Sequence, residues 1–174
     1  SLEKHGVQAF HHAADVGNPN DIAAMIEAAN ARFGAIDILV NNAGILRDKS
    51  LLKMEEDDFD AVIAVHLKGT FLCSQAVLAP MQSAGWGRIV NLSSTAGKTI
   101  STAGGAHYTT AKHGVLGLTR HLAKAYGPDG VTVNAVCPFD YFDAANREIL
   151  LSAIRPRQPS ASSRPFSSSG SSLT

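Results

Sequence analysis

The chain has 174 residues, of which 45% are hydrophobic and 17% are charged, and its 15 basic side chains are balanced by 15 acidic ones. That length fits one domain with a sizeable core, and the balanced charge gives no reason to expect nucleic acid or an anionic membrane as the main partner. The two cysteines make no disulfide framework, and no signal peptide or apolar stretch long enough to span a bilayer is predicted. We therefore expect a soluble, cytoplasmic protein.

The first third of the chain predicts a strand, a helix and a second strand. Residues 7–15 (VQAFHHAAD) indicate a short strand, and residues 18–34 indicate a helix that Asn18 or Asn20 caps, that has Pro19 in its first turn and that Gly34 ends. Residues 35–42 (AIDILVNN) are almost continuously apolar, which is typical of a strand covered on both faces of a parallel sheet.

The rest of the ordered part continues this alternation. After a loop at residues 43–50 we expect a long helical region over 54–81, a strand over 87–94, a helix over 107–127 and a strand over 130–138. Strands that alternate with helices of this length indicate right-handed crossover connections and a parallel sheet. The predicted fold class is α/β.

The C-terminal segment has a different composition. Residues 151–174 are dominated by serine, proline and arginine and contain few apolar side chains. Such a segment cannot bury enough surface to offset the entropy of ordering it. We predict one domain over residues 1–150 and a disordered tail over 151–174.

Three motifs occur in chain order: NNAG at 41–44 ends one predicted strand, NLSS at 91–94 ends the next, and YTTAK at 108–112 opens the helix after that. The carboxyl ends of parallel strands meet at one edge of a sheet, where ligands bind. Tyr108 and Lys112 are one helical turn apart. An isolated pair of this kind could be two ordinary surface residues, but the order of the motifs favours a phenol beside a cation that stabilises its ionised form.

These motifs, with AADV at 13–16, DILVNNAGI at 37–45 and VTVNAVCP at 131–138, resemble the short-chain dehydrogenase/reductase family, classical type, and within it 3-oxoacyl-carrier-protein reductases. The resemblance implies a Rossmann-type, doubly wound parallel sheet in three layers. It also implies NAD or NADP as cofactor and hydride transfer between the nicotinamide and the carbon of an alcohol or carbonyl group.

The family's catalytic roles can be carried to three residues of this chain. Tyr108 would be the general acid/base, and Lys112 would modulate it and bond the nicotinamide ribose. Ser94 would hold the substrate oxygen; Ser93 is its structural rival, and the spacing to Gly97 favours Ser94. The implied substrate is a small-molecule carbonyl or alcohol, and a 3-oxoacyl thioester fits best.

The resemblance also implies a set of cofactor contacts. Asp15 would accept from the adenine amino group, Val16 would supply a backbone donor, the NAG segment would line the adenosine side, and a proline would touch the nicotinamide. The predicted cofactor-binding residues are Asp15, Val16, Asn42, Ala43, Gly44, Tyr108, Lys112 and Pro138. For Asn41 we prefer a role in capping the strand end.

Two positions depart from the family pattern, and a metal site is not expected. Phe139 follows Pro138 where the family normally has glycine, and His66 stands where it usually has asparagine. His66 could join a proton relay or could only pack between helices. The other histidines lack the spacing of metal ligands.

The family's N-terminal glycine-rich turn is not found in this sequence, so we suspect a fragment. Without the strand that normally lies beside it, residues 37–42 would form an exposed edge. The alternative to an active oxidoreductase is therefore a catalytically inactive remnant that acts at most as an association module. Family resemblance places the homo-oligomer contacts on the helix around residues 60–84 and on the helix of Tyr108.

Overall fold

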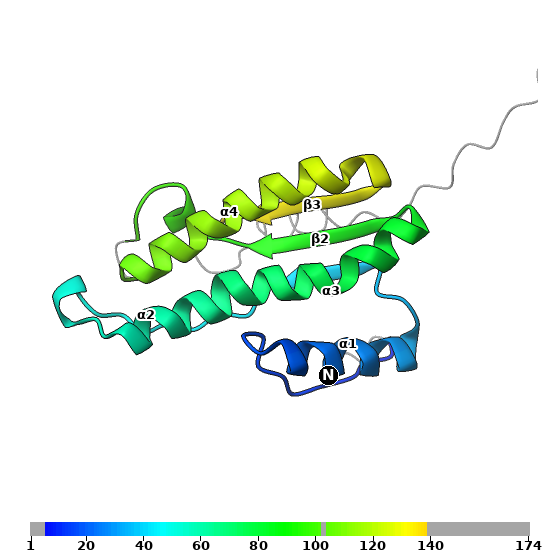
Figure 1. Cartoon of the computed structure of the whole chain (residues 1–174), viewed down its shortest axis with the longest axis horizontal. Coiled ribbons are helices and arrows are strands. Elements are labelled where there is room, and N and C mark those ends of the chain that lie inside the picture. The colour runs from blue at the N-terminus through cyan, green and yellow to red at the C-terminus, as the bar shows by residue number, and fades with distance from the viewer. Residues whose placement is uncertain (1–5, 102–103, 139–174) are drawn as a thin grey trace, which may run out of the picture.

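The computed structural model describes residues 6–101 and 104–138, which form a parallel sheet and its connecting helices (Figure 1). The strands are β1 (Ile38–Asn41), β2 (Gly87–Leu92) and β3 (Val131–Val136), in the order β1-β2-β3. Val40 pairs with Val90, and Asn91 pairs with Ala135. Because both pairings are parallel, the carboxyl ends of all three strands lie at one edge.

The helices are α1 (Pro19–Phe33), α2 (Glu56–Ile63), α3 (Gly69–Ala84) and α4 (Ala106–Tyr126). A π-helical turn, η3 (Ala64–Lys68), joins α2 to α3, and short 3-10 turns lie at η2 (Leu51–Lys53), η4 (Thr95–Gly97) and η5 (Gly127–Asp129). The predicted start and end of α1 are confirmed: Asn18 Oδ1 accepts from the Asn20 amide at 2.9 Å, and Gly34 ends the helix with a φ of 84°.

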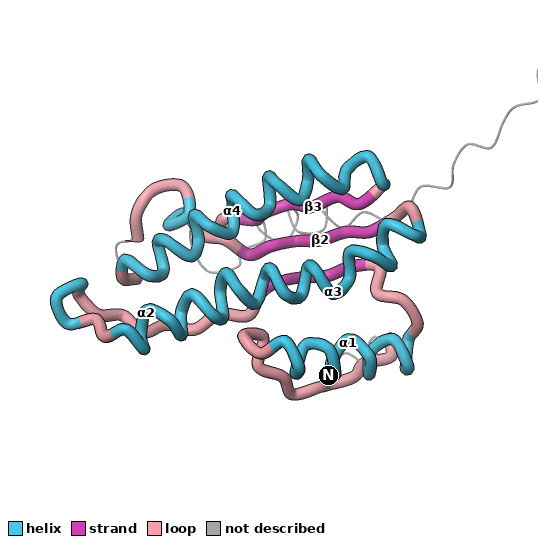
Figure 2. The backbone as a smooth tube through the Cα atoms, viewed as in Figure 1, coloured by secondary structure: helices cyan, strands magenta, loops and turns pink. Residues whose placement is uncertain are grey.

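The helices α3 and α4 cover the same face of the sheet (Figures 1 and 2). This follows from the topology, because each crossover connects neighbouring parallel strands in the same direction and such connections are right-handed. The predicted Rossmann-type α/β fold is confirmed. Of its three expected layers, the described residues build the sheet and one helical layer.

The core lies between this helical layer and the sheet. Its buried side chains come from α3, α4, β2 and β3, and they are Val77, Leu78, Met81, Ile89, Leu122, Val131 and Val133. Burying one such side chain stabilises a fold by about 1.5–3 kcal/mol. The sheet is also bridged by polar groups: Asn41 donates to Asn91 Oδ1 at 2.9 Å, and Asn91 donates to Thr119 Oγ1 at 2.9 Å. These contacts fix the end of β1 to β2 and to α4.

The sequence predictions for residues 7–15 and for β1 need correction. Within the described part of the chain, residues 7–15 form no strand, and β1 pairs only with β2. A strand needs a neighbour for its backbone hydrogen bonds, and the described chain offers none to residues 7–15. On β1, Ile38 and Val40 are 39% and 42% exposed, so the expectation of cover on both faces is wrong and the expectation of an exposed edge is confirmed.

The continuous helix over Glu56–Ala84 also corrects a prediction. By length and composition it is long and apolar enough to cross a membrane, contrary to the expectation that no stretch would be, and 44% of its most apolar window is buried. Core helices meet the same criteria, and α3 buries Val77, Leu78 and Met81 against the sheet.

Candidate active site

A cavity of about 310 Å³ opens at the carboxyl edge of the sheet. Its walls come from the segments that follow β1, β2 and β3, from the π-helical turn and from the first turns of α4. The lining residues are Asn42, Gly44, Ile45, Leu46, His66, Leu92, Ser93, Tyr108, Lys112 and Pro138. Five of the predicted site residues, namely Asn42, Gly44, Tyr108, Lys112 and Pro138, therefore border one space.

Lys112 is buried beside Tyr108. Its Nζ donates to the Leu92 carbonyl oxygen at 2.6 Å and lies 5.6 Å from the centre of the Tyr108 ring. Burial lowers the pKa of Lys112 to about 8, an effect that the negative charge of an ionised Cys137 would partly oppose. Near neutral pH the cavity therefore holds a positive charge next to a phenol, which is the arrangement that stabilises a phenolate.

His66 also packs against Tyr108. The two rings are 5.3 Å apart between centroids and nearly perpendicular, at 86°. His66 Nε2 lies 2.8 Å from the Ile45 carbonyl oxygen and 3.1 Å from the Ile45 amide nitrogen, while its buried Nδ1 has no hydrogen-bond partner among the described residues. Burial is the main cause that lowers the pKa of His66, and Lys112 adds to it.

The two neighbouring serines occupy different environments. Ser93 is buried, lines the cavity and donates from Oγ to the Lys112 carbonyl oxygen at 2.9 Å. Ser94 is half-buried and caps the η4 turn, since its Oγ accepts from the Ala96 amide at 3.2 Å. Ser94 is thus not among the residues that line the cavity, although it follows one that does.

A second cavity, of about 250 Å³, lies along the open edge of β1. Its lining includes Val16, Asn41, Asn42, Ala43 and Gly69, and Asn42 also borders the first cavity. The structure brings Val16, Asn42 and Ala43 together here. Asp15 lies outside this lining, and its Oδ1 accepts from the Gly17 amide at 2.8 Å.

Sequence reasoning gave too little weight to Ser93 and His107. His107 is fully buried at the start of α4, directly before Tyr108. Its only sequence signal was a polar residue in the first turn of the helix, where backbone amides need acceptors. Phe139 lies outside the described residues. Within residues 6–101 and 104–138, no group of three His, Cys, Asp or Glu side chains could hold a metal ion.

This geometry defines a class of protein: a Rossmann-type sheet with a Tyr–Lys pair at its carboxyl edge. The model of the short-chain dehydrogenase family matches residues 1–148, and the chain belongs to that family. The family assignment made from the sequence motifs is confirmed.

Several relatives share this stretch. The 3-oxoacyl-[acyl-carrier-protein] reductase FabG of Staphylococcus aureus (strain N315) is 40% identical over 152 residues, which are 85% of this chain and 61% of the reductase. The (2S)-[(R)-hydroxy(phenyl)methyl]succinyl-CoA dehydrogenase subunit BbsD of Thauera aromatica is 44% identical over 153 residues, covering 84% and 59%. D-beta-hydroxybutyrate dehydrogenase of Rhizobium meliloti is 41% identical over 129 residues, covering 74% and 50%. The chain thus spans between half and about three-fifths of the length of these relatives.

Proposed function

We propose that this protein is an NAD(P)-dependent oxidoreductase that interconverts a carbonyl group and a secondary alcohol, with Tyr108 as general acid/base. The observation that carries the proposal is the position of the buried Lys112 ammonium, 5.6 Å from the centre of the Tyr108 ring in a cavity that both residues line. Membership of the short-chain dehydrogenase family supports the same reaction class.

The second cavity has walls that suit the adenosine part of the cofactor. Its walls include the small or apolar residues Val16, Ala43 and Gly69, and it shares Asn42 with the lining of the Tyr108 cavity. A side chain at position 69 would collide with Val16, because its Cβ would lie 2.9 Å from Val16 Cγ2. We assign the adenosine to this cavity and the nicotinamide to the neighbourhood of Tyr108 and Pro138; when bound, the reduced nicotinamide supplies the hydride.

The protein's own part in the reaction is to move one proton. As a carbonyl carbon is reduced, its oxygen becomes an alkoxide, and Tyr108 gives that oxygen the phenolic proton. Lys112 stabilises the phenolate that remains, and the phenolate is then reprotonated from solvent. Ser94 is assigned the hydrogen bond to the substrate oxygen, with its hydroxyl turned from the Ala96 amide toward the substrate.

The substrate class proposed is a 3-oxoacyl thioester. Two of the relatives carry an acyl-carrier-protein or a CoA ester in their names. At the cavity wall, Leu46 is 68% exposed, which offers an acyl chain an apolar contact outside the polar centre. NAD or NADP as the cofactor and a cytoplasmic location stay predictions.

The test uses the full chain with NADH or NADPH and an acetoacetyl thioester. We expect quenching of Trp86 fluorescence by the nucleotide and loss of reduced-nicotinamide absorbance when substrate is added. In Tyr108→Phe, turnover should fall by about 10²–10⁴-fold while nucleotide affinity stays within about twofold, because the lost hydroxyl acts in proton transfer. Turnover retained in Tyr108→Phe refutes the general acid/base assignment.

The alternative, an inactive remnant that only associates, has one observation in its favour. Phe59 and Phe71 on α2 and α3 are 40% and 44% exposed, and such side chains suit a helix-mediated contact between copies. Oligomers without nucleotide binding or turnover in the wild-type chain would favour this alternative. Binding and turnover favour the enzyme in any oligomeric state.

A further inference from the structure

The helix that carries Tyr108 begins without a capping side chain from its N-cap residue. That residue is Gly105, so it offers no acceptor to the unpaired amides of the first helical turn. The Tyr108 amide instead donates to Nδ1 of His107 at 2.7 Å. A histidine inside the first turn thus supplies the acceptor that an N-cap side chain would otherwise offer to this amide.

The second ring nitrogen of His107 leaves the helix and reaches the loop after β1. Nε2 lies 2.9 Å from the Arg47 carbonyl oxygen. Because Nδ1 accepts from an amide, Nε2 must carry the ring hydrogen and donate it, so the imidazole is neutral and both its nitrogens are used. His107 is 0% exposed, and neither bond competes with bulk water.

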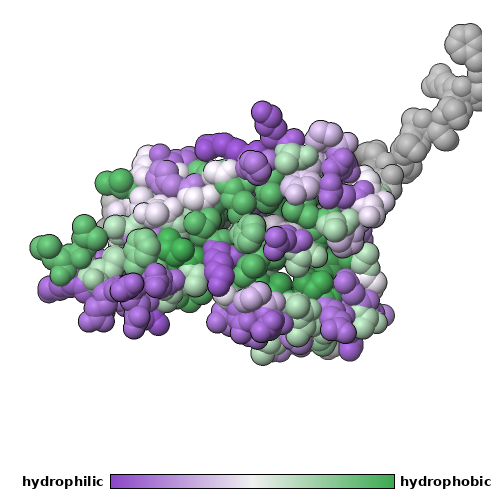
Figure 3. All heavy atoms as spheres, in the orientation of Figure 1, coloured by the Kyte–Doolittle hydropathy of each residue, from purple (hydrophilic) through white to green (hydrophobic). Residues whose placement is uncertain are grey.

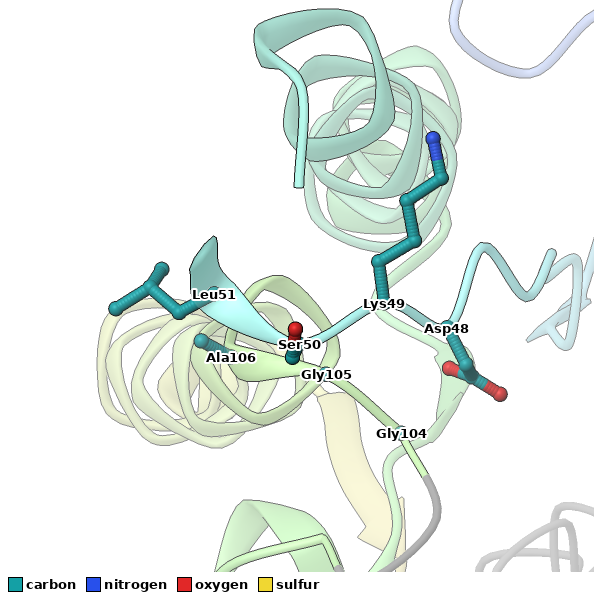
Figure 4. A pocket seen from close by; sticks show the side chains of 7 residues that line it. All are labelled: Asp48, Lys49, Ser50, Leu51, Gly104, Gly105 and Ala106. Atoms are coloured by element: carbon teal, nitrogen blue, oxygen red, sulfur yellow. The ribbon is translucent and has the colours of Figure 1, made fainter. Parts of the chain in front are cut away.

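The loop lies close against the start of α4 along this contact. Figure 4 shows residues 48–51 crossing the chain at Gly104–Ala106, with Lys49 extended away toward the helix of α2. A Cβ at position 105 would lie 2.9 Å from both His107 Cε1 and Met54 Cε, so a side chain there would displace the His107 ring or the Met54 methyl group. The far side of the loop is tied down by Lys49 Nζ, 2.6 Å from Asp58 Oδ2.

Two imidazoles therefore contact the same short segment, residues 45–47, one from the π-helical turn and one from α4, the helix of Tyr108. His66 of the π-helical turn contacts the backbone of Ile45, and His107 of α4 contacts the backbone of Arg47. Ile45 and Leu46 are walls of the cavity that Tyr108 faces. The position of that wall relative to Tyr108 is set through these two rings.

We propose that His107 is a positioning residue, which fixes Tyr108 on one side and the 45–47 wall of the cavity on the other. The catalytic meaning of this position rests on the proposed function. The positioning itself is a property of the folded chain, and it can be measured without turnover.

Two conservative variants separate the two bonds. In His107→Asn the side-chain oxygen can still accept from the Tyr108 amide but no donor reaches Arg47; in His107→Gln a donor reaches Arg47 but the acceptor is lost. We expect amide hydrogen exchange of Tyr108 to accelerate by about tenfold in His107→Gln only, and that of Ile45 by about tenfold in His107→Asn only. His113→Asn, an exposed position of the same helix, is the control and should change neither rate.

The kinetic measurement is separate. If the wild-type chain turns over, both variants should lower kcat and change the KM for the nucleotide less, because His107 does not line the cavity along β1 to which the adenosine is assigned. Exchange rates within twofold of wild type for both amides in both variants overturn the proposal for His107. Absence of turnover in the wild-type chain refutes the proposed function instead and leaves the exchange result to decide the role of His107.

Discussion

Lys112 Nζ donates to the backbone carbonyl oxygen of Leu92 at 2.6 Å, which joins the helix of the proposed acid/base to the end of the central strand. Lys112 is 6% exposed, and its ammonium group has no carboxylate partner among the described residues. Burying an unpaired cation lowers the free energy of unfolding, and ionisable groups with shifted pKa values cluster at functional sites.

The first prediction concerns this cost. Burial lowers the pKa of Lys112 from 10.5 to about 8, so between these two pH values the unfolded chain binds a proton that the folded chain does not. The free energy of unfolding should therefore rise with pH across this interval, by up to about 3 kcal/mol. Below pH 8 both states are protonated and the contribution of Lys112 is constant.

The measurement compares urea unfolding at pH 7 and pH 10 in the wild type and in Lys112→Met. The free energy of unfolding should increase more between pH 7 and pH 10 in the wild type than in Lys112→Met, because only the wild type has the buried Lys112. Lys124→Met, at an exposed position near the end of the same helix, should behave like the wild type. An equal gain in wild type and Lys112→Met contradicts the assigned pKa.

The second prediction separates the adjacent serines. Ser93→Ala removes the buried bond to the Lys112 carbonyl oxygen and should lower the free energy of unfolding by about 0.5–1.5 kcal/mol. Ser94→Ala removes only a half-exposed cap of a three-residue turn, so its stability should stay within about 0.5 kcal/mol of wild type. If Ser94 binds the substrate oxygen, turnover falls most in Ser94→Ala; a larger fall in Ser93→Ala assigns that role to Ser93.

Much of the fold could be predicted because its signals are local. Asn18, Pro19 and Gly34 bound α1, and the apolar runs mark β2 and β3. The failures came from long-range effects. Residues 7–15 have the composition of a strand, but a strand forms only when a partner lies beside it, and composition does not report the partner.

The site could be predicted in part for the same reason. The spacing of Tyr108 and Lys112 puts both on one face of a helix, and parallel topology brings the strand ends to that face. The link from His107 to Arg47 spans 60 residues, and no local pattern indicates it. Which of the two serines points toward α4 depends on how the chain turns after β2. Two adjacent serines in the sequence do not indicate this, and in the structure it is Ser93 that donates to the Lys112 carbonyl oxygen.

The third prediction concerns the acid stability of the His66 contact. Because burial lowers the pKa of His66 below its ordinary value of 6.5, the folded chain keeps the imidazole neutral while the unfolded chain takes up a proton. This contribution to stability is present above pH 6.5 and is lost as pH falls through the folded pKa. In urea unfolding, the free energy of unfolding of the wild type should fall between pH 7 and pH 5. The fall should be smaller in His66→Asn. The exposed histidine variant His121→Asn should lose as much as the wild type.

The fourth prediction tests the close approach of the 45–54 loop to α4. In Gly105→Ala the new Cβ would lie 2.9 Å from His107 Cε1, 2.9 Å from Met54 Cε and 3.1 Å from the Lys49 carbonyl oxygen, so the buried His107 ring and the Met54 methyl group must move. We expect a loss of about 1–3 kcal/mol in the free energy of unfolding, together with faster amide exchange at Ile45.

Gly117→Ala is the matched control, since no atom lies within 4 Å of its added Cβ and it stands inside α4. Alanine there should stabilise the helix by about 0.5–1 kcal/mol. Two variants of equal stability would show that the loop does not depend on glycine at position 105.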